Sequence, residues 1–171
     1  MSLIPDWAPN VHPLLVHFPL ALLLVATLVD GVGAWRPSHA SIRDTATWLY
    51  CGGAFMAMAA YFSGLDAAEA LRVGTETSAA VSAHFGWADR TTWFFVFFAS
   101  FRMALSYIWR TTARWVVVLS VLVALVGLAV LATAADHGGR LVFRHGLGVA
   151  PIPAKGPLWT IPGALPDEPM R

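Results

Sequence analysis

The sequence predicts an all-α integral membrane protein, a four-helix bundle with both termini on the periplasmic side. Hydrophobic residues make up 57% of the chain and charged residues only 12%, whereas a soluble domain carries about 25% charge. Four segments hold the roughly 20 apolar residues that a helix needs to cross a bilayer. We therefore expect one four-helix transmembrane domain over residues 1–149, followed by an extended Pro-rich tail over residues 150–171.

The first predicted helix spans Pro13–Trp35 and begins with an unusual pair of prolines. The first proline suits the start of a helix, where no N–H donor is needed. Pro19 lies further in, removes a backbone hydrogen bond and clashes with the preceding turn. We therefore expect a kink near His17. Asp30, near the other end, is costly in hydrocarbon and is expected to face the interior or an arginine.

The second and third predicted helices span Thr45–Leu65 and Thr91–Trp109. Glycine and alanine recur through the second helix, which favours close helix packing and would equally make room for a flat cofactor. A polar stretch separates the two helices. Thr77 or Ser78 in that stretch is a candidate cap for a helix that runs through His84 into the third span.

The fourth predicted helix spans Arg114–Ala135 and is the most uniformly apolar of the set. The Gly138–Gly139 pair follows it, together with Gly146 and Gly148. These glycines predict a tight re-entrant or surface loop, because glycine tolerates positive φ and close backbone approach. Arg102, deep in the third helix, is expected to snorkel or to pair with a carboxylate. The chain shows no convincing internal repeat.

The arginines predict the orientation in the membrane. The loops after the first helix and between the third and fourth helices carry Arg36, Arg43, Arg110 and Arg114. Short loops rich in Lys and Arg stay in the cytoplasm. Both termini are therefore expected outside it, in the periplasm of a bacterium whose inner membrane the chain crosses. The net charge is near zero, which gives no electrostatic case for nucleic acid.

The histidines predict a site on the outer side of that membrane. With four crossings, five of the six histidines fall on the same, outer side: His12, His17, His84, His137 and His145. The sixth, His39, lies in a cytoplasmic loop and is expected to be solvated. Ionisable residues at membrane depth mark functional sites more often than structural ones.

Two histidines from different helices are the axial ligands that hold a b-type haem in a helical bundle. His12 and His17 are five residues apart, which separates them by about 140° on a regular helix. Each is therefore expected to pair with a histidine from another segment. We expect His17 and His84 to bind the haem, with His12 and His145 as a second pair or as supporting residues. His137 is an alternative partner for His12.

Arginines near this side would pair with the haem propionates, and the candidates are Arg90, Arg144 and Arg140. A zinc or copper ion uses the same imidazole ligands, so a metal site formed by His17, His84, His12 and His145 stays open as an alternative. The third possibility is that no cofactor binds and that each histidine only donates a hydrogen bond to a backbone carbonyl.

Two motifs resemble a known family. HPLLVHFPLALL (His12–Leu23) and GGRLVFRHGLGV (Gly138–Val149) are similar to the signatures of the bacterial four-helix membrane proteins grouped as domain of unknown function 2231. The resemblance implies four transmembrane helices. Members often occur beside c-type cytochrome domains or fused to them, which implies a respiratory or redox setting. The positions that match are His12, His17, His145 and His84, and Phe143 stands where members commonly have Tyr.

These observations together predict an electron-transfer or accessory subunit rather than a stand-alone enzyme. It would bind haem b and exchange electrons between a quinone or dehydrogenase partner and a periplasmic c-type cytochrome. The alternative is a structural or anchor subunit of a larger respiratory complex that carries no cofactor of its own.

Overall fold

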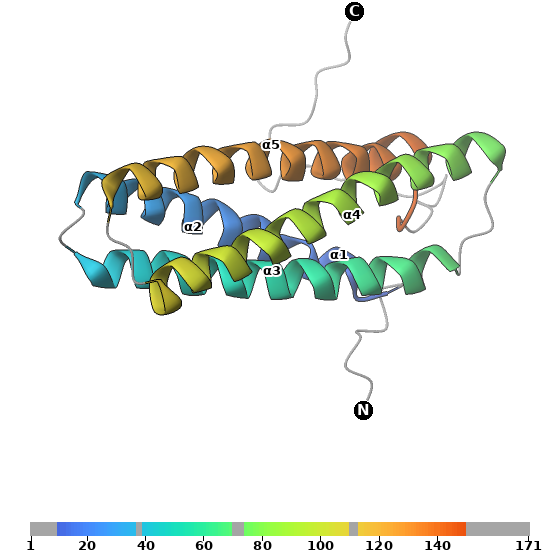
Figure 1. Cartoon of the computed structure of the whole chain (residues 1–171). Helices are drawn as coiled ribbons and strands as arrows, with labels where there is room; N and C mark the ends of the chain where they lie inside the picture. The colour runs from blue at the N-terminus through green and yellow to red at the C-terminus, as the bar shows by residue number, and fades with distance from the viewer. Residues whose placement is uncertain (1–9, 37–38, 70–73, 110–112, 150–171) are drawn as a thin grey trace, which may run out of the picture.

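The computed structural model describes residues 10–36, 39–69, 74–109 and 113–149. One short and four long α-helices make up almost all of these residues, which confirms the all-α class (Figure 1). Their bounds are α1 His12–Leu15, α2 His17–Trp35, α3 Ala40–Glu69, α4 Thr75–Met103 and α5 Arg114–His145, and a π-helix, η1, spans Ala104–Ile108.

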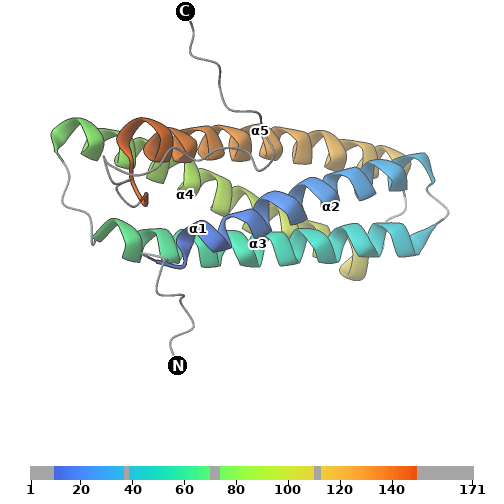
Figure 2. The same cartoon turned by 180° about the vertical axis from the view of Figure 1, so that it is seen from behind.

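The four long helices lie side by side, and successive helices run in opposite directions (Figures 1 and 2). Helix α2 packs against α3 and α5, and α4 packs against the same two helices. One end of the molecule, at the left of Figure 1, holds the end of α2 and the start of α3. We call it the tryptophan end, after four largely exposed residues: Trp35, Trp48, Trp109 and Trp115. The opposite end, which holds the start of α4 and the end of α5, is the histidine end.

The kink expected near His17 is confirmed as a break between α1 and α2 at Val16. The short α1 contains Pro13 in its first turn, and the Val16 N–H still donates to the His12 carbonyl at 3.1 Å. Pro19, which cannot donate a backbone hydrogen bond, is buried in the first turn of α2. The break turns α1 toward α3, against which it packs.

The helices extend further than the sequence predicted. The predicted second helix starts at Ala40 rather than Thr45 and ends at Glu69 rather than Leu65, so Arg43 lies in its first turn and not in a loop. The predicted third helix corresponds to the second half of α4 together with η1, and the expected helix through His84 into this span is confirmed. Helix α4 begins after the extended residue Gly74. The predicted caps Thr77 and Ser78 are therefore inside the helix. Packing against α3 and α5 stabilises these polar turns, which hydropathy alone does not favour.

Helix α5 begins at Arg114, as expected, but runs ten residues beyond the predicted end. The prediction of a loop at Gly138–Gly139 is wrong, because both glycines are helical. The helix ends at Gly146, whose φ of 64° is left-handed. Its N–H and that of Leu147 donate back to the Val142 and Leu141 carbonyls, both at 3.0 Å. A left-handed glycine is the usual end of a helix, because it has no Cβ to clash.

Three of the described helical segments are long and apolar enough to cross a membrane: His12–Trp35, Thr75–Ile108 and Arg114–His145. Helix α3 is of similar length, but it is less apolar because alanine, glycine and threonine fill its buried side. These small residues let Tyr50, Phe95 and Phe98 fill the core between the helices. The rings of Tyr50 and Phe98 meet edge to face, with their centroids 4.9 Å apart.

Candidate functional site

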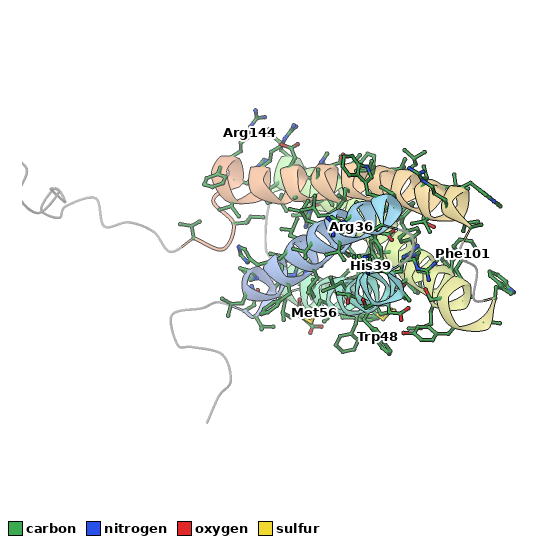
Figure 3. The ribbon with its side chains drawn as sticks, turned by 90° about the vertical axis from the view of Figure 1, so that its left-hand side faces the viewer. Arg36, His39, Trp48, Met56, Phe101 and Arg144 are labelled. Carbon is green, nitrogen blue, oxygen red and sulfur yellow. The ribbon has the colours of Figure 1, made fainter. Side chains whose placement is uncertain are left out.

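The histidine end brings together side chains from three helices. His12 lies on α1, His84 on α4, and His137 and His145 on α5. His39 lies at the tryptophan end and is exposed, as the sequence predicted (Figure 3).

His12 is fixed by the last turns of α3. Its Nδ1 lies 2.9 Å from the Ala60 carbonyl oxygen and 3.1 Å from the Ser63 hydroxyl. A carbonyl only accepts hydrogen bonds, so Nδ1 carries the proton and donates it to Ala60. Gly64 leaves space for the ring, since a Cβ at that position would lie 3.0 Å from the His12 Cε1 atom.

His84 is fixed by α5 in the same manner. Its Nδ1 donates to the Ala134 carbonyl at 3.0 Å. Gly138 lies against the ring, and a Cβ there would lie 3.0 Å from the His84 Cε1 atom. This contact explains why the chain carries glycine inside α5, where glycine weakens a helix by about 1 kcal/mol relative to alanine.

Both imidazoles are thereby held in the tautomer that binds a metal. With the proton on Nδ1, the Nε2 lone pair is free to act as a ligand. A backbone carbonyl that accepts the Nδ1 proton is a common second-shell partner of ligating histidines, because it orients the ring and raises its basicity. The half-buried His84 also lies within Coulombic range of His12 and of His137.

The other predicted ligands lie in different surroundings. The side chain of His17 is exposed, and within the described residues its ring makes no hydrogen bond. His145 lies at the end of α5, where its Nδ1 is 3.3 Å from the Thr77 hydroxyl of α4. His137 donates from Nδ1 to the Thr133 carbonyl of its own helix at 2.9 Å. Among these histidines, His12 and His84 are the two whose Nδ1 atoms are held by a backbone carbonyl of another helix.

The arginines predicted to pair with haem propionates are all exposed and do not point into the space between the helices. Arg90 is exposed, donates to the Gly86 carbonyl at 3.2 Å, and lies over the Trp87 ring with 5.1 Å between its Cζ atom and the ring centroid. Arg144 is exposed on the outside of α5 (Figure 3). Arg140, the other candidate, forms an exposed ion pair with Asp136 at 2.7 Å.

The number of possible ligands at the histidine end can be compared with what zinc and haem each require. Within the residues that the structure describes, no three His, Cys, Asp or Glu side chains gather closely enough to hold a metal ion. Zinc sites use three or four protein ligands, whereas a haem iron already has four porphyrin nitrogens and needs only two axial ligands. The two carbonyl-oriented imidazoles fit that second requirement.

One protein-family model matches most of the chain. The family model described as "Predicted membrane protein (DUF2231)" matches residues 8–151. The chain belongs to the DUF2231 family. The match includes both motifs on which the resemblance rested, so that prediction is confirmed. Comparisons of this DUF2231 protein with curated proteins and with solved structures found no match.

The DUF2231 chain holds a second polar cluster deep between its helices, toward the tryptophan end. Arg102 of α4 donates to Asp30 of α2 at 2.7 Å, and both side chains are almost completely buried. Asp30 therefore faces the interior and an arginine, as expected, and of the two alternatives expected for Arg102, snorkelling or pairing, the structure shows pairing. Arg102 also lies over the ring of the buried Tyr50, with 5.9 Å between its Cζ atom and the ring centroid.

Three buried polar atoms have no hydrogen-bond partner within the described residues, and two of them belong to this cluster. They are Oδ2 of Asp30, Nε of Arg102 and Nη1 of Arg43. A neighbouring chain of hydroxyls is satisfied, since Tyr50 donates to Thr27 at 3.3 Å. Unpaired buried polar atoms are unfavourable, so the ion pair lies in the interior at a cost in stability.

Sequence reasoning found His12 and His84 but missed the groups that orient them. Those groups form an Ala-x-x-x-Gly pattern on the helix after each histidine: Ala60 to Gly64 on α3, and Ala134 to Gly138 on α5. Small residues four apart let a neighbouring helix approach closely. The same pattern therefore signals where an imidazole can reach the backbone carbonyl of a neighbouring helix.

Substitution of Gly138 tests how tightly His84 is held. We expect Gly138→Ala to be less stable than Gly139→Ala by about 1 kcal/mol or more, because both variants gain the same helix propensity but only the methyl group at position 138 overpacks the His84 ring. The measurement is thermal unfolding of the purified protein in detergent. Gly139→Ala is the matched control, since a Cβ at Gly139 meets no atom within 4 Å. Equal stability of the two variants would contradict the close contact.

Proposed function

We propose that this DUF2231 chain binds haem b in the membrane and transfers electrons. The observation that carries the proposal is the matched pair of imidazoles at the histidine end. His12 and His84 come from different helices, and each donates its Nδ1 proton to a carbonyl of a neighbouring helix. A bound haem supplies one-electron redox chemistry, and its axial ligands tune the reduction potential.

In this proposal the protein holds both Nε2 atoms in place and keeps water away. The carbonyls of Ala60 and Ala134 fix the orientation of each ring and raise the basicity of its Nε2 atom. Aromatic side chains surround this end of the helices, and the rings of Tyr61 and Phe85 lie 5.3 Å apart. Such an apolar setting lowers the local dielectric, which affects the potential of any redox group there.

We propose that all four long helices cross the bilayer as a bundle. Helix α3 has 30 residues, a length of about 45 Å, which exceeds the roughly 30 Å of hydrocarbon. Large apolar side chains are exposed around the outside, among them Leu28, Phe55, Phe97 and Val126. The exposed tryptophans of the tryptophan end suit the boundary between lipid and water, where amphipathic rings are enriched.

The arginines of the loops favour the tryptophan end as the cytoplasmic one. Arg36 and Arg114 border the two connections at that end. The histidine end would then face the periplasm, where a c-type cytochrome would exchange electrons with it. The other partner would be a membrane quinone or a dehydrogenase of a larger respiratory complex.

A groove between α3 and α4 supports the choice of a quinone. It has a volume of about 370 Å³, and its lining includes Cys51, Phe55, Met58, Val96, Ser100 and Met103. Two of its lining residues, Cys51 and Met103, directly follow Tyr50 and Arg102 in the sequence. Its largely apolar lining suits an isoprenoid chain, which partitions into such surroundings by the hydrophobic effect.

The alternative proposal is an anchor subunit without a cofactor. The observation that favours it is the same pair of hydrogen bonds, since a purely structural histidine also donates to a carbonyl. In that case the Nε2 atoms have no ligand, and the histidines only tie α1 to α3 and α4 to α5.

A reduced-minus-oxidised absorbance spectrum of the detergent-purified protein, with a pyridine haemochrome assay, separates the two proposals. We expect a b-type band in the wild type, loss of that band in His84→Ala, and no change in the control His39→Ala, whose histidine is exposed at the other end. A flat spectrum from folded wild-type protein rules out the haem proposal, and zinc and copper contents would then be measured.

A further inference from the structure

Two pairs of chemically important residues share one spacing. His84 lies 72 positions after His12, and Arg102 lies 72 positions after Asp30. The two histidines play the same part at the histidine end, and the two charged residues bond to each other at 2.7 Å. A regular spacing of buried residues occurs along any helix. Here, however, the shared spacing connects residues with corresponding roles: the first member of each pair lies on α1 or α2, and the second lies on α4.

The helices that follow share a second spacing. Gly138 lies 74 positions after Gly64, and Ala134 lies 74 positions after Ala60. In each case the alanine carbonyl accepts the histidine Nδ1 proton, at 2.9 and 3.0 Å. In each case the glycine also faces the histidine Cε1 atom, at 3.0 Å from an added Cβ.

The correspondence continues in the middle of the helices. Gly127 lies 74 positions after Gly53, and Phe95 lies 72 positions after Leu23. A Cβ added at Gly53 would clash with the Leu23 side chain at 2.5 Å. One added at Gly127 would clash most closely with the Phe94 ring and also with the Phe95 ring, at 2.8 Å. The same glycine-to-large-residue contact therefore occurs twice, once in each half of the chain.

The packing of the helices agrees with a twofold relation. Exchanging α2 with α4 and α3 with α5 turns the observed neighbours into themselves, because α2–α3 becomes α4–α5 and α3–α4 becomes α5–α2. Figures 1 and 2 show the two antiparallel pairs alongside each other. Two equivalent residues that touch each other must straddle such an axis, and Asp30 and Arg102 do so.

We infer that the chain is two copies of one helical hairpin related by a pseudo-twofold axis, and that His12 and His84 bind a single haem on this axis as equivalent ligands. The second part rests on the proposed function and sets both the number of haems and the pairing. Binding sites between repeats are common in membrane proteins. This inference differs from the sequence analysis, which found no convincing internal repeat.

The first experiment measures haem content per chain by pyridine haemochrome in His12→Ala, His84→Ala, the double variant and the control His17→Ala. We expect one haem per wild-type chain and a loss of roughly tenfold or more in each single variant. The double variant should lose no more than the singles, and His17→Ala should keep full occupancy. The wild type should also give one low-spin electron paramagnetic resonance signal typical of two imidazole ligands.

The outcomes separate the inference from the proposed function. A wild type without haem overturns the proposed function and the shared ligand pair with it. Two haems per chain, or full occupancy in His12→Ala alongside loss in His84→Ala, overturns the shared pair while the proposed function stands.

The second experiment tests the repeat without reference to haem, by exchanging the charges of the pair. Asp30→Arg and Arg102→Asp alone each leave two like charges buried together, and we expect each to lower the midpoint of thermal unfolding by roughly 10 °C or more. The double exchange should recover most of that loss, because a twofold axis makes the two backbone positions interchangeable. A double variant no more stable than the singles overturns the axis.

Discussion

Replacement of Arg102 with methionine is expected to lower the free energy of unfolding by about 3–5 kcal/mol. The substitution keeps the volume of the side chain but leaves the Asp30 carboxylate, which is completely buried, without its only opposite charge among the described residues. An isolated buried charge is far less stable than a paired one. Chemical or thermal unfolding in detergent, followed by tryptophan fluorescence, measures the loss.

The double variant Arg102→Met with Asp30→Leu is the control. Replacing both partners with apolar residues removes the uncompensated charge, and such exchanges are often neutral or stabilising. We therefore expect the double variant to be at least as stable as the wild type. Wild-type stability in the single variant Arg102→Met would show that Asp30 finds another partner and that the pair does not hold α2 to α4.

Replacement of Gly127 with valine is expected to lower the free energy of unfolding by about 1–3 kcal/mol or more, the range for overpacked cores. A Cβ at this position lies 2.8 Å from the Phe95 ring and closer still to Phe94. Both rings are packed into the core or against it, so neither has room to move. Helices α4 and α5 would have to separate.

Gly139→Val in the same helix is the matched control for Gly127→Val, because a Cβ there is in open space. Both substitutions carry the same change in helix propensity, so the difference in their unfolding midpoints isolates the packing effect. Similar midpoints would mean that α4 and α5 are further apart than the structure has them.

Much of the fold could be predicted from the sequence, because long apolar runs identify helices directly. The start of α5 at Arg114 and the break before His17 agree with the structure. The helix that begins near Thr77 and runs through His84 was also predicted to within a few residues. The ends of α3 and the end of α5 could not be predicted, since their outer turns are polar and gain stability from tertiary contacts. The pair Gly138–Gly139 resembled a loop because glycine is common in loops. Gly138 is helical and faces the His84 ring, a tertiary contact that no local sequence pattern reveals.

The candidate site was predicted by position but not by pairing. Topology alone places His12 and His84 at one end, as the order of the helices shows. Which ring faces inward depends on how each helix is rotated, and the break at Val16 changes that rotation between His12 and His17. The repeat escaped notice because few identical residues mark it: one His, one Ala and two Gly positions carry the contacts.

The Asp30–Arg102 pair has a consequence for how the chain is made. Asp30 leaves the ribosome 72 residues before Arg102, which at 5–20 residues per second is about 4–14 s. During that time the Asp30 carboxyl group has no arginine partner from α4, and its cost in the bilayer is at most the roughly 3 kcal/mol that holds for a carboxylate at a helix centre. The first hairpin is therefore expected to gain its full stability only when α4 arrives and Arg102 pairs with Asp30.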